Sequence, residues 1–397
     1  MLRPARERKL PATSTMKRVP LRQRPTRRAR AGALLSTATL LLGVCRWSPA
    51  TAAASTATAV ASTSVAGSAG ARSVPFRCPS TAIAAGAART GPAQGKRLRI
   101  ITTVAPITSI VANIAGEKAD VHGIIPEGED SHTYEPKPSV ATQIAKADIV
   151  FVNGLKLEDP TREIATKSIP KTGQVIELGS LTVSPDRYIY DFSFPKDGGK
   201  PNPHLWTNPP MARCYASIAA SAMEKADPGN AAYFRANEKR YTARLDELDQ
   251  LMTVATASMP ATNRKLLTYH DAYAYFAVRY GWKVIGAIQV SSFEDPTPKE
   301  VTNLIRQVKS EKVPAIFGSE VFPSSVLAQI GKETGVKYVD KLRDDDLPGA
   351  PGQPGHSYLG LMKFDFFTMV SNLGGNATML AAFDATDVAP DRAEYPQ

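Results

Sequence analysis

Three of the five histidines in this chain lie in polar stretches at similar separations. His132 and His204 are 72 residues apart, His204 and His270 are 66 apart, and Asp345 follows His270 by 75 residues. Imidazole nitrogen is a ligand suited to zinc and its neighbours, and a carboxylate would complete a four-coordinate shell with one negative charge. Ligands so far apart leave no local signature, so spacing alone does not distinguish a metal site from solvated histidines.

Short apolar segments typical of strands alternate with amphipathic segments typical of helices. The first set of predicted strands is 98–103, 121–125, 149–152 and 175–178, with helical patterns at 107–114 and 140–147. The second set is 265–269, 284–288, 315–317 and 336–339. Strands that are apolar on both faces and alternate with helices indicate parallel sheets flanked by helices, so we expect two α/β lobes.

One long helix is expected between the two lobes. Residues 230–259 contain no Gly or Pro and carry apolar residues at helical spacing. A helix of that length extends about 45 Å and would join the lobes as a stiff strut. His270 directly follows the predicted strand 265–269, and parallel α/β sheets bind ligands beyond the carboxyl ends of their strands. With two candidate ligands in each lobe, a site in the cleft between the lobes is expected.

The residues around the candidate ligands resemble those of a known family. Its pattern is matched by PEGEDSHTYEP at 126–136, NPHLW at 202–206, YHDAYAYF at 269–276 and DDDL at 344–347. These segments are similar, in order and spacing, to those of the zinc- and manganese-binding proteins that serve ABC importers, and the resemblance covers about residues 98–373. It implies two lobes joined by a long rigid helix, with a divalent metal held by His132, His204, His270 and Asp345. It also implies delivery of the metal to an ABC permease in the cytoplasmic membrane.

Three departures bear on the metal and its ligands. Asn202 stands where the family usually has an acid, so orientation of the His204 ring would pass to the amide, a carbonyl or water. Three consecutive acids leave Asp344 and Asp346 as alternatives to Asp345, which we choose because it lies two residues before Leu347. Manganese-preferring members often have an acid where this chain has His270, so zinc is expected, with manganese as the alternative.

The charge of the chain is concentrated near its start. Residues 1–44 contain eleven Lys and Arg and one acid, a net of +10, which leaves +1 of the total +11 and argues against a nucleic-acid surface. The uncharged run 31–44 that follows is typical of an export signal over 1–45. It ends at Cys45, a candidate lipid attachment site. We therefore expect a protein exported to the periplasm or anchored at the outer face of the cytoplasmic membrane.

The remaining divisions of the chain follow from composition and helix length. Residues 46–95 are rich in Ala, Ser and Thr and are expected to form a disordered stalk. The N-terminal lobe is then 96–228, the connecting helix 229–260, the C-terminal lobe 261–376 and a tail 377–397. Cys78 falls in the predicted stalk and Cys214 on a predicted helix, so no structural disulfide is expected.

Two other functions, and three further residues as ligands, are less well supported by the sequence. A zinc hydrolase would need an open metal position and a general base, and no His-Glu-x-x-His motif is present in the sequence. Surface adhesion is a further alternative for a tethered protein of this type. A monomer that is not an enzyme is expected. His122 in a predicted strand, His356 in a Pro/Gly-rich loop and Glu320 are expected to lie outside the metal shell.

Overall fold

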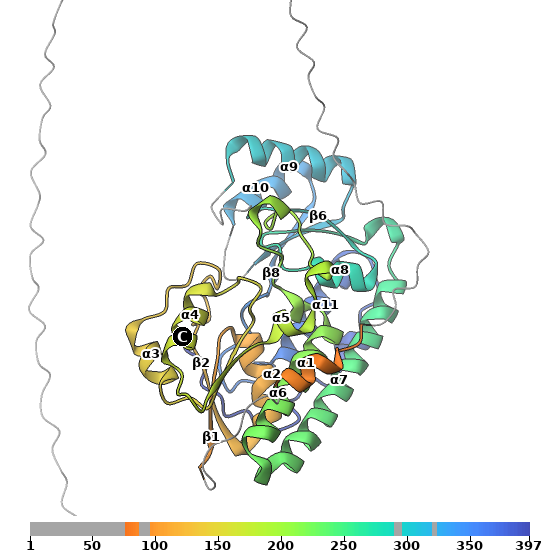
Figure 1. Ribbon diagram of the computed structural model, residues 1–397. Helices are drawn as coiled ribbons and strands as arrows, with labels where there is room; N and C mark the ends of the chain where they lie inside the picture. The colour runs from red at the N-terminus through yellow and green to blue at the C-terminus, as the bar shows by residue number, and fades with distance from the viewer. Residues whose placement is uncertain (1–75, 87–95, 290–295, 320–323) are drawn as a thin grey trace, which may run out of the picture. The chain divides into compact units, whose positions relative to one another are not determined.

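Two parallel β-sheets organise the part of the chain that the computed structural model describes, which comprises residues 76–86, 96–289, 296–319 and 324–397 (Figure 1). The strand order is β2-β1-β3-β4 in the first sheet and β6-β5-β7-β8 in the second. All pairings within the two sheets are parallel. The predicted α/β class with two sheets flanked by helices is therefore confirmed.

The first lobe contains the strands β1 (Leu98–Thr102), β2 (Ala119–Gly123), β3 (Ile149–Val152) and β4 (Gln174–Glu177). Its longer helices are α2 (Ala105–Ala115), α3 (Pro138–Ile144), α4 (Asp159–Ser168) and α6 (Pro209–Ala226), and α5 (Leu178–Thr182) is short. Every residue of β3 is buried, because helices cover both faces of an inner parallel strand. This is why the strand is apolar along its whole length.

The second lobe contains the strands β5 (Lys265–Thr268), β6 (Lys283–Ala287), β7 (Ala315–Ser319) and β8 (Lys337–Leu342). Its helices are α8 (Ala274–Tyr280), α9 (Pro298–Glu311), α10 (Ser325–Thr334), α11 (Tyr358–Asn372) and α12 (Thr378–Ala382). The sequence Thr297-Pro298-Lys299-Glu300 begins α9 with a capping box, in which Glu300 also accepts a hydrogen bond from the Thr297 backbone at 2.7 Å.

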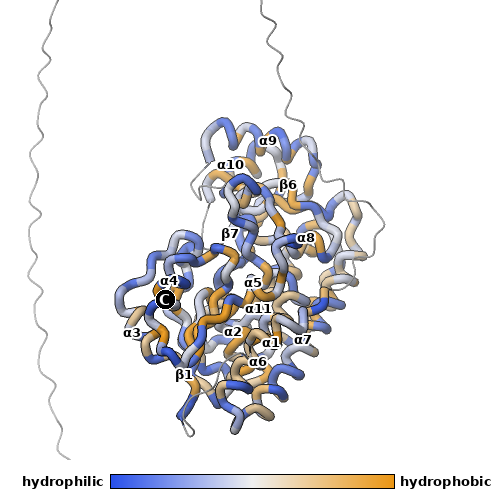
Figure 2. The backbone as a smooth tube through the Cα atoms, viewed as in Figure 1, coloured by the Kyte–Doolittle hydropathy of each residue, from blue (hydrophilic) through white to orange (hydrophobic). Residues whose placement is uncertain are grey.

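The long helix α7 (Ala231–Ala257) follows the first lobe in sequence and precedes β5. Its 27 residues extend about 40 Å. One face, formed by Phe234, Tyr241, Leu245, Leu248 and Met252, is buried, and hydrophobic and hydrophilic stretches alternate along the helix (Figure 2). Helix α7 contacts α2 and α6, which precede it in the chain, and α11 and α12, which follow it, so it joins the lobes as expected.

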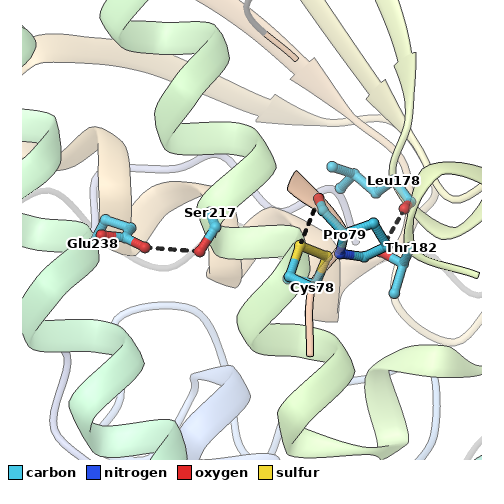
Figure 3. The surroundings of a disulfide bond; sticks show 7 residues. Cys78, Pro79, Leu178, Thr182, Ser217 and Glu238 are labelled. Carbon is cyan, nitrogen blue, oxygen red and sulfur yellow. Dashed lines mark hydrogen bonds between the residues drawn. A yellow bond between two sulfur atoms is a disulfide. The ribbon is translucent and has the colours of Figure 1, made fainter. Parts of the chain in front are cut away.

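A disulfide between Cys78 and Cys214 fixes a segment that precedes the first strand (Figure 3). Helix α1 (Ser80–Gly86) packs on α6, where a Cβ on Gly86 would come within 2.7 Å of the Ile218 carbonyl oxygen. The prediction of no structural disulfide is wrong, and residues 76–86 are not the disordered stalk expected of 46–95. The small residues of α1 bury little area, but they allow α1 to approach α6 closely, because α6 also carries small residues. The disulfide then stabilises this packing covalently.

The predicted export signal, Cys45 and the stalk up to residue 75 lie outside the described residues. Within the described ranges, no helix combines the length and the apolar character needed to cross a bilayer.

Residues 383–397, here called the strap, run from α12 back to the first lobe. Glu394 forms a parallel bridge with His122 at the edge of β2, where its backbone donates to Val121 at 3.0 Å and accepts from Gly123 at 2.9 Å. Nearer the start of the strap, Asp387 accepts from Asn113 of α2 at 2.7 Å. The segment expected to be only a tail therefore covers the outer edge of the first sheet.

Candidate metal centre

Three histidines from distant parts of the sequence meet at the carboxyl ends of the strands. His132 lies in the loop after β2, His270 lies two residues beyond the end of β5, and His204 immediately precedes the short turn 205–207 that leads into α6. His204 and His270 are buried, and His132 is partly exposed. The group formed by these three residues has its ligand atoms within 4.8 Å of one another. This placement agrees with the expectation that loops beyond the carboxyl ends of the strands bring the three histidines together.

The Nε2 atoms of the three rings converge on one point. Nε2 of His132 lies 3.2 Å from Nε2 of His204 and 3.2 Å from Nε2 of His270, and the last two atoms are 2.9 Å apart. In a tetrahedral zinc site with Zn–N bonds of 2.0 to 2.1 Å, neighbouring nitrogens are separated by about 3.3 Å. The rings therefore stand close to the spacing that one tetrahedral cation requires.

Two amide side chains fix the other ring nitrogens. Asn202 Oδ1 lies 2.9 Å from Nδ1 of His204, and Gln289 Oε1 lies 2.7 Å from Nδ1 of His270. The orientation of the Asn202 amide is set by its own donors, because Nδ2 donates to Asp191 and to the Asp271 backbone. Since an amide oxygen can only accept, both Nδ1 atoms carry a proton, so each ring in its neutral form presents the Nε2 lone pair to the centre.

His132 is positioned by its own loop. Its backbone N–H donates to Asp130 Oδ1 at 2.9 Å, and its ring packs against Phe194 with centroids 5.5 Å apart. A small cavity of about 10 Å³ borders His132 and is lined in part by Lys156 and Lys200. This volume is close to that needed for a single water molecule, so the partly exposed ring marks the side from which an ion could approach.

The three consecutive acids after β8 have different partners. Asp345 Oδ2 accepts a hydrogen bond from Ser131 in the His132 loop, whereas its buried Oδ1 has no hydrogen-bond partner. Asp346 accepts from the Gly128 backbone at 2.9 Å. Asp344 Oδ2 lies 3.7 Å from His270 Nε2. Thus the structure does not bring Asp345 into the group of three histidines, although it leaves one of its oxygens unpaired nearby in the acidic loop.

Burial sets the protonation of the site. It is the largest cause that lowers the pKa of His132 and of His204 well below the usual value, and the charge of His270 lowers both further. Burial also opposes the charged form of His270, but Asp344 and Asp345 outweigh it and raise its pKa. Burial, followed by the neighbouring charge of Asp344, raises the pKa of Asp345 to about 8. A buried acidic cluster of this kind is stabilised in its ionised form by a cation.

Some residues of the site could be found only in the structure. Gln289 follows β6, and its position at a strand end is a signal for a residue near the site. Its residue type alone does not identify it as a partner of His270. His122 pairs instead with Glu394 at 2.9 Å, and His356 packs on Tyr395 with ring centroids 4.8 Å apart. Neither belongs to the three-histidine group. Glu320 lies outside the described residues.

Most of the described chain matches a protein-family model and several known proteins. A family model described as the periplasmic component A of the zinc-uptake complex matches residues 100–371. The manganese ABC transporter substrate-binding lipoprotein PsaA of Streptococcus mitis is 26% identical over 291 residues, which are 73% of this chain and 94% of the relative. The iron ABC transporter substrate-binding lipoprotein MtsA of Streptococcus pyogenes serotype M1 is 26% identical over 71% of this chain and 91% of its own. The solved periplasmic zinc binding protein TroA from Treponema pallidum has a TM-score of 0.64 and 25% identity, and the match covers 70% of this chain and 99% of that one.

Proposed function

The chain belongs to the family of periplasmic A components of zinc-uptake complexes, and we propose that the metal it carries is Zn²⁺, held by His132, His204, His270 and Asp345. It is a substrate-binding component of a metal ABC transporter and not an enzyme. The relatives are named for manganese, iron or zinc, so the family alone does not select the ion. The choice of zinc rests on the ligands of this chain.

The observation that carries the proposal is the convergence of three lone pairs on one point. The Nε2 atoms lie 2.9 to 3.2 Å apart, and amide oxygens hold two of the rings in the tautomer that directs a lone pair inward. Lone pairs at such distances repel one another unless a proton or a cation lies between them. A divalent cation satisfies all three at once.

Three imidazoles favour zinc over manganese. Imidazole suits zinc, whereas manganese prefers carboxylate, carbonyl and water oxygens. Asp345 is proposed as the fourth ligand because its buried Oδ1 has no other partner. A carboxylate here would complete a closed tetrahedral shell, which is suited to carrying an ion and leaves no position for a reactive water.

Calorimetric titration of the full chain with Zn²⁺ and with Mn²⁺ tests the choice of ion. We expect one zinc per chain, bound at least about tenfold more tightly than manganese. His270→Ala should weaken zinc binding by at least about a hundredfold, because it removes one of four ligands. Glu163→Ala is the control, since this exposed acid on α4 pairs with Lys167 and should leave the affinity unchanged. Tighter binding of manganese than of zinc would contradict the proposal.

The place of the protein in transport follows from the family. We propose that it works outside the cytoplasm as a monomer, is tethered through a lipid on Cys45, and passes zinc to a permease in the cytoplasmic membrane. The stiffness of α7 predicts that the lobes move little on metal binding. Small-angle scattering of the metal-free and zinc-loaded protein checks this, because a wide hinge closure would change the radius of gyration.

A further inference from the structure

Glu127 connects three parts of the molecule around the candidate metal centre. It lies in the loop between β2 and α3 that carries His132. Its Oε1 accepts a hydrogen bond from the Leu347 backbone at 2.8 Å, and its Oε2 accepts from the Gln397 side chain at 2.8 Å. Its own backbone N–H donates to the Pro396 carbonyl at 3.1 Å. One carboxylate therefore joins the His132 loop, the acidic loop after β8 and the end of the strap.

The bond from Glu127 to Leu347 is one of several contacts that close these two loops on each other. Gly128 donates to Asp346, and Ser131 donates to Asp345. Both acceptors belong to the loop that supplies the proposed fourth ligand. The second oxygen of Glu127 accepts from Gln397 of the strap and also lies 3.6 Å from Nε2 of His356, near the end of the loop before α11. The strap therefore contributes to the position of Glu127 together with His356.

The strap is attached to the first lobe at points that do not involve the metal loops. Asn113 both donates to Asp387 at 2.7 Å and accepts from the Val388 backbone at 2.9 Å. Arg240 of α7 donates to the Val388 carbonyl at 3.0 Å. The bridge of Glu394 to β2 then holds the segment just before Pro396. These anchors fix the end of the strap against Glu127.

We propose that Glu127, held by Pro396 and Gln397, is a positioning residue that latches the His132 loop to the acidic loop and slows release of the metal. This inference rests on the proposed function of the site. The strap lies beyond residues 100–371, the part of the chain that the family model matches.

The latch acts on release because the two loops must separate before the ion can leave. Separation of the loops breaks the charge-assisted hydrogen bond from the Leu347 backbone to Glu127. Because the strap holds the Glu127 carboxylate in place, the carboxylate cannot follow the acidic loop as that loop moves away. The rate of binding is set by access to the open site, in which this bond is not yet formed. Loss of the latch should therefore change dissociation far more than association.

Stopped-flow transfer of zinc from the loaded full chain to a chromophoric chelator measures the release rate. Glu127→Ala should speed release about tenfold and Gln397→Ala about threefold, the effects expected for loss of one or two hydrogen bonds, one of them to a charged group. Glu127→Gln should fall between them, because its amide oxygen can still accept from Leu347. Adding Gln397→Ala to Glu127→Ala should have no further effect, since the partner is already absent. The association rate should stay within about twofold throughout.

Glu163→Ala is the matched control, because Glu163 is an exposed acid on α4 whose partner is Lys167, and its release rate should equal that of the wild type. If the wild-type chain binds no zinc, the proposed function fails. If the wild type binds zinc and the release rates of Glu127→Ala and Gln397→Ala match it, only the latch is refuted. Should Glu127→Ala not fold, Gln397→Ala still decides, because this exposed side chain can be removed without disturbing a core.

Discussion

Asn202 is hydrogen-bonded on one side to His204 and on the other to the Asp191 carboxyl and the Asp271 backbone. Its Oδ1 lies 2.9 Å from Nδ1 of His204, while its Nδ2 donates to Asp191 at 3.0 Å and to the Asp271 carbonyl at 2.6 Å. Burial, followed by the charge of Asp271, raises the pKa of Asp191 to about 9. An acid at position 202 could not donate either of these two hydrogen bonds and would add a third carboxyl beside Asp191 and Asp271. An amide therefore fits this position better than the acid that is usual in the family.

The first prediction concerns Asn202. Asn202→Ala should lower zinc affinity by about ten- to a hundredfold, the usual effect of removing a residue that orients a ligating histidine. Asn202→Asp should also bind zinc less tightly and should lower the free energy of unfolding, because it removes the hydrogen bond from Asn202 to Asp191 and places another carboxyl beside it. Calorimetry and urea unfolding of both variants check this. Tighter zinc binding by Asn202→Asp would contradict it.

The second prediction identifies the acid ligand. Asp345→Asn should weaken zinc binding by at least about a hundredfold, because a neutral amide replaces the only proposed anionic ligand. Asp344→Asn should weaken it by about tenfold or less, through loss of a nearby negative charge. The two variants have the same size and adjacent positions, so each controls for the other in a zinc titration. If the order of the two effects is reversed, Asp344 is the ligand, as its distance of 3.7 Å from His270 Nε2 would allow.

The third prediction concerns pH. The pKa of Asp345 is raised to about 8, so the metal-free protein holds this proton at pH 7 and zinc must displace it. The lowered pKa values of His132 and His204 mean that both rings are already neutral at pH 7. Because the pKa of His270 is also raised, zinc displaces a proton from that ring as well, and apparent affinity should rise at least tenfold per pH unit from about 6.5 to 8. Calorimetry at pH 7 in buffers of different ionisation enthalpy should show release of at least one proton, and release of none would contradict the assignment.

The fourth prediction concerns the disulfide. Replacing Cys78 and Cys214 together by Ser should lower the free energy of unfolding by about 2 to 4 kcal/mol, because the bond closes a long loop in the unfolded chain. Zinc affinity should stay unchanged, since none of the proposed ligands lies on α1 or α6. Urea unfolding and zinc titration of the double variant measure the two effects separately. Equal stability of the double variant and the wild type would show that the bond does not hold α1 in place.

Most of the fold could be predicted because its signals are local. Each expected strand is present within a few residues of its predicted bounds, since wholly apolar segments such as Ile149–Val152 suit the inner strands of a parallel sheet. The long helix α7 could be predicted because residues 230–259 contain no Gly or Pro that would interrupt a helix. Helix α1 was missed because Ala-rich composition predicts disorder, and only the disulfide and close packing on α6 overcome that tendency.

The candidate site was predictable in its histidines but not in their support. The motifs around His132, His204 and His270 were recognisable, whereas Gln289 carries no motif and is placed by the end of β6. The choice among Asp344, Asp345 and Asp346 depends on distances of a few tenths of a nanometre within one loop, which adjacent positions in a sequence cannot encode. The same holds for Glu127, whose partners Leu347 and Gln397 lie more than 200 residues away.

The bond between Cys78 and Cys214 also decides where mechanical load enters the molecule. A pull on the chain ahead of residue 78 is transmitted through the sulfur atoms to α6, a long helix packed along α7, and so bypasses β1. Strand β1 lies in the middle of the first sheet, between β2 and β3, and would otherwise take that tension directly. In a protein attached to a surface through its N-terminal segment, force on that segment would therefore bypass the sheet whose loop carries His132.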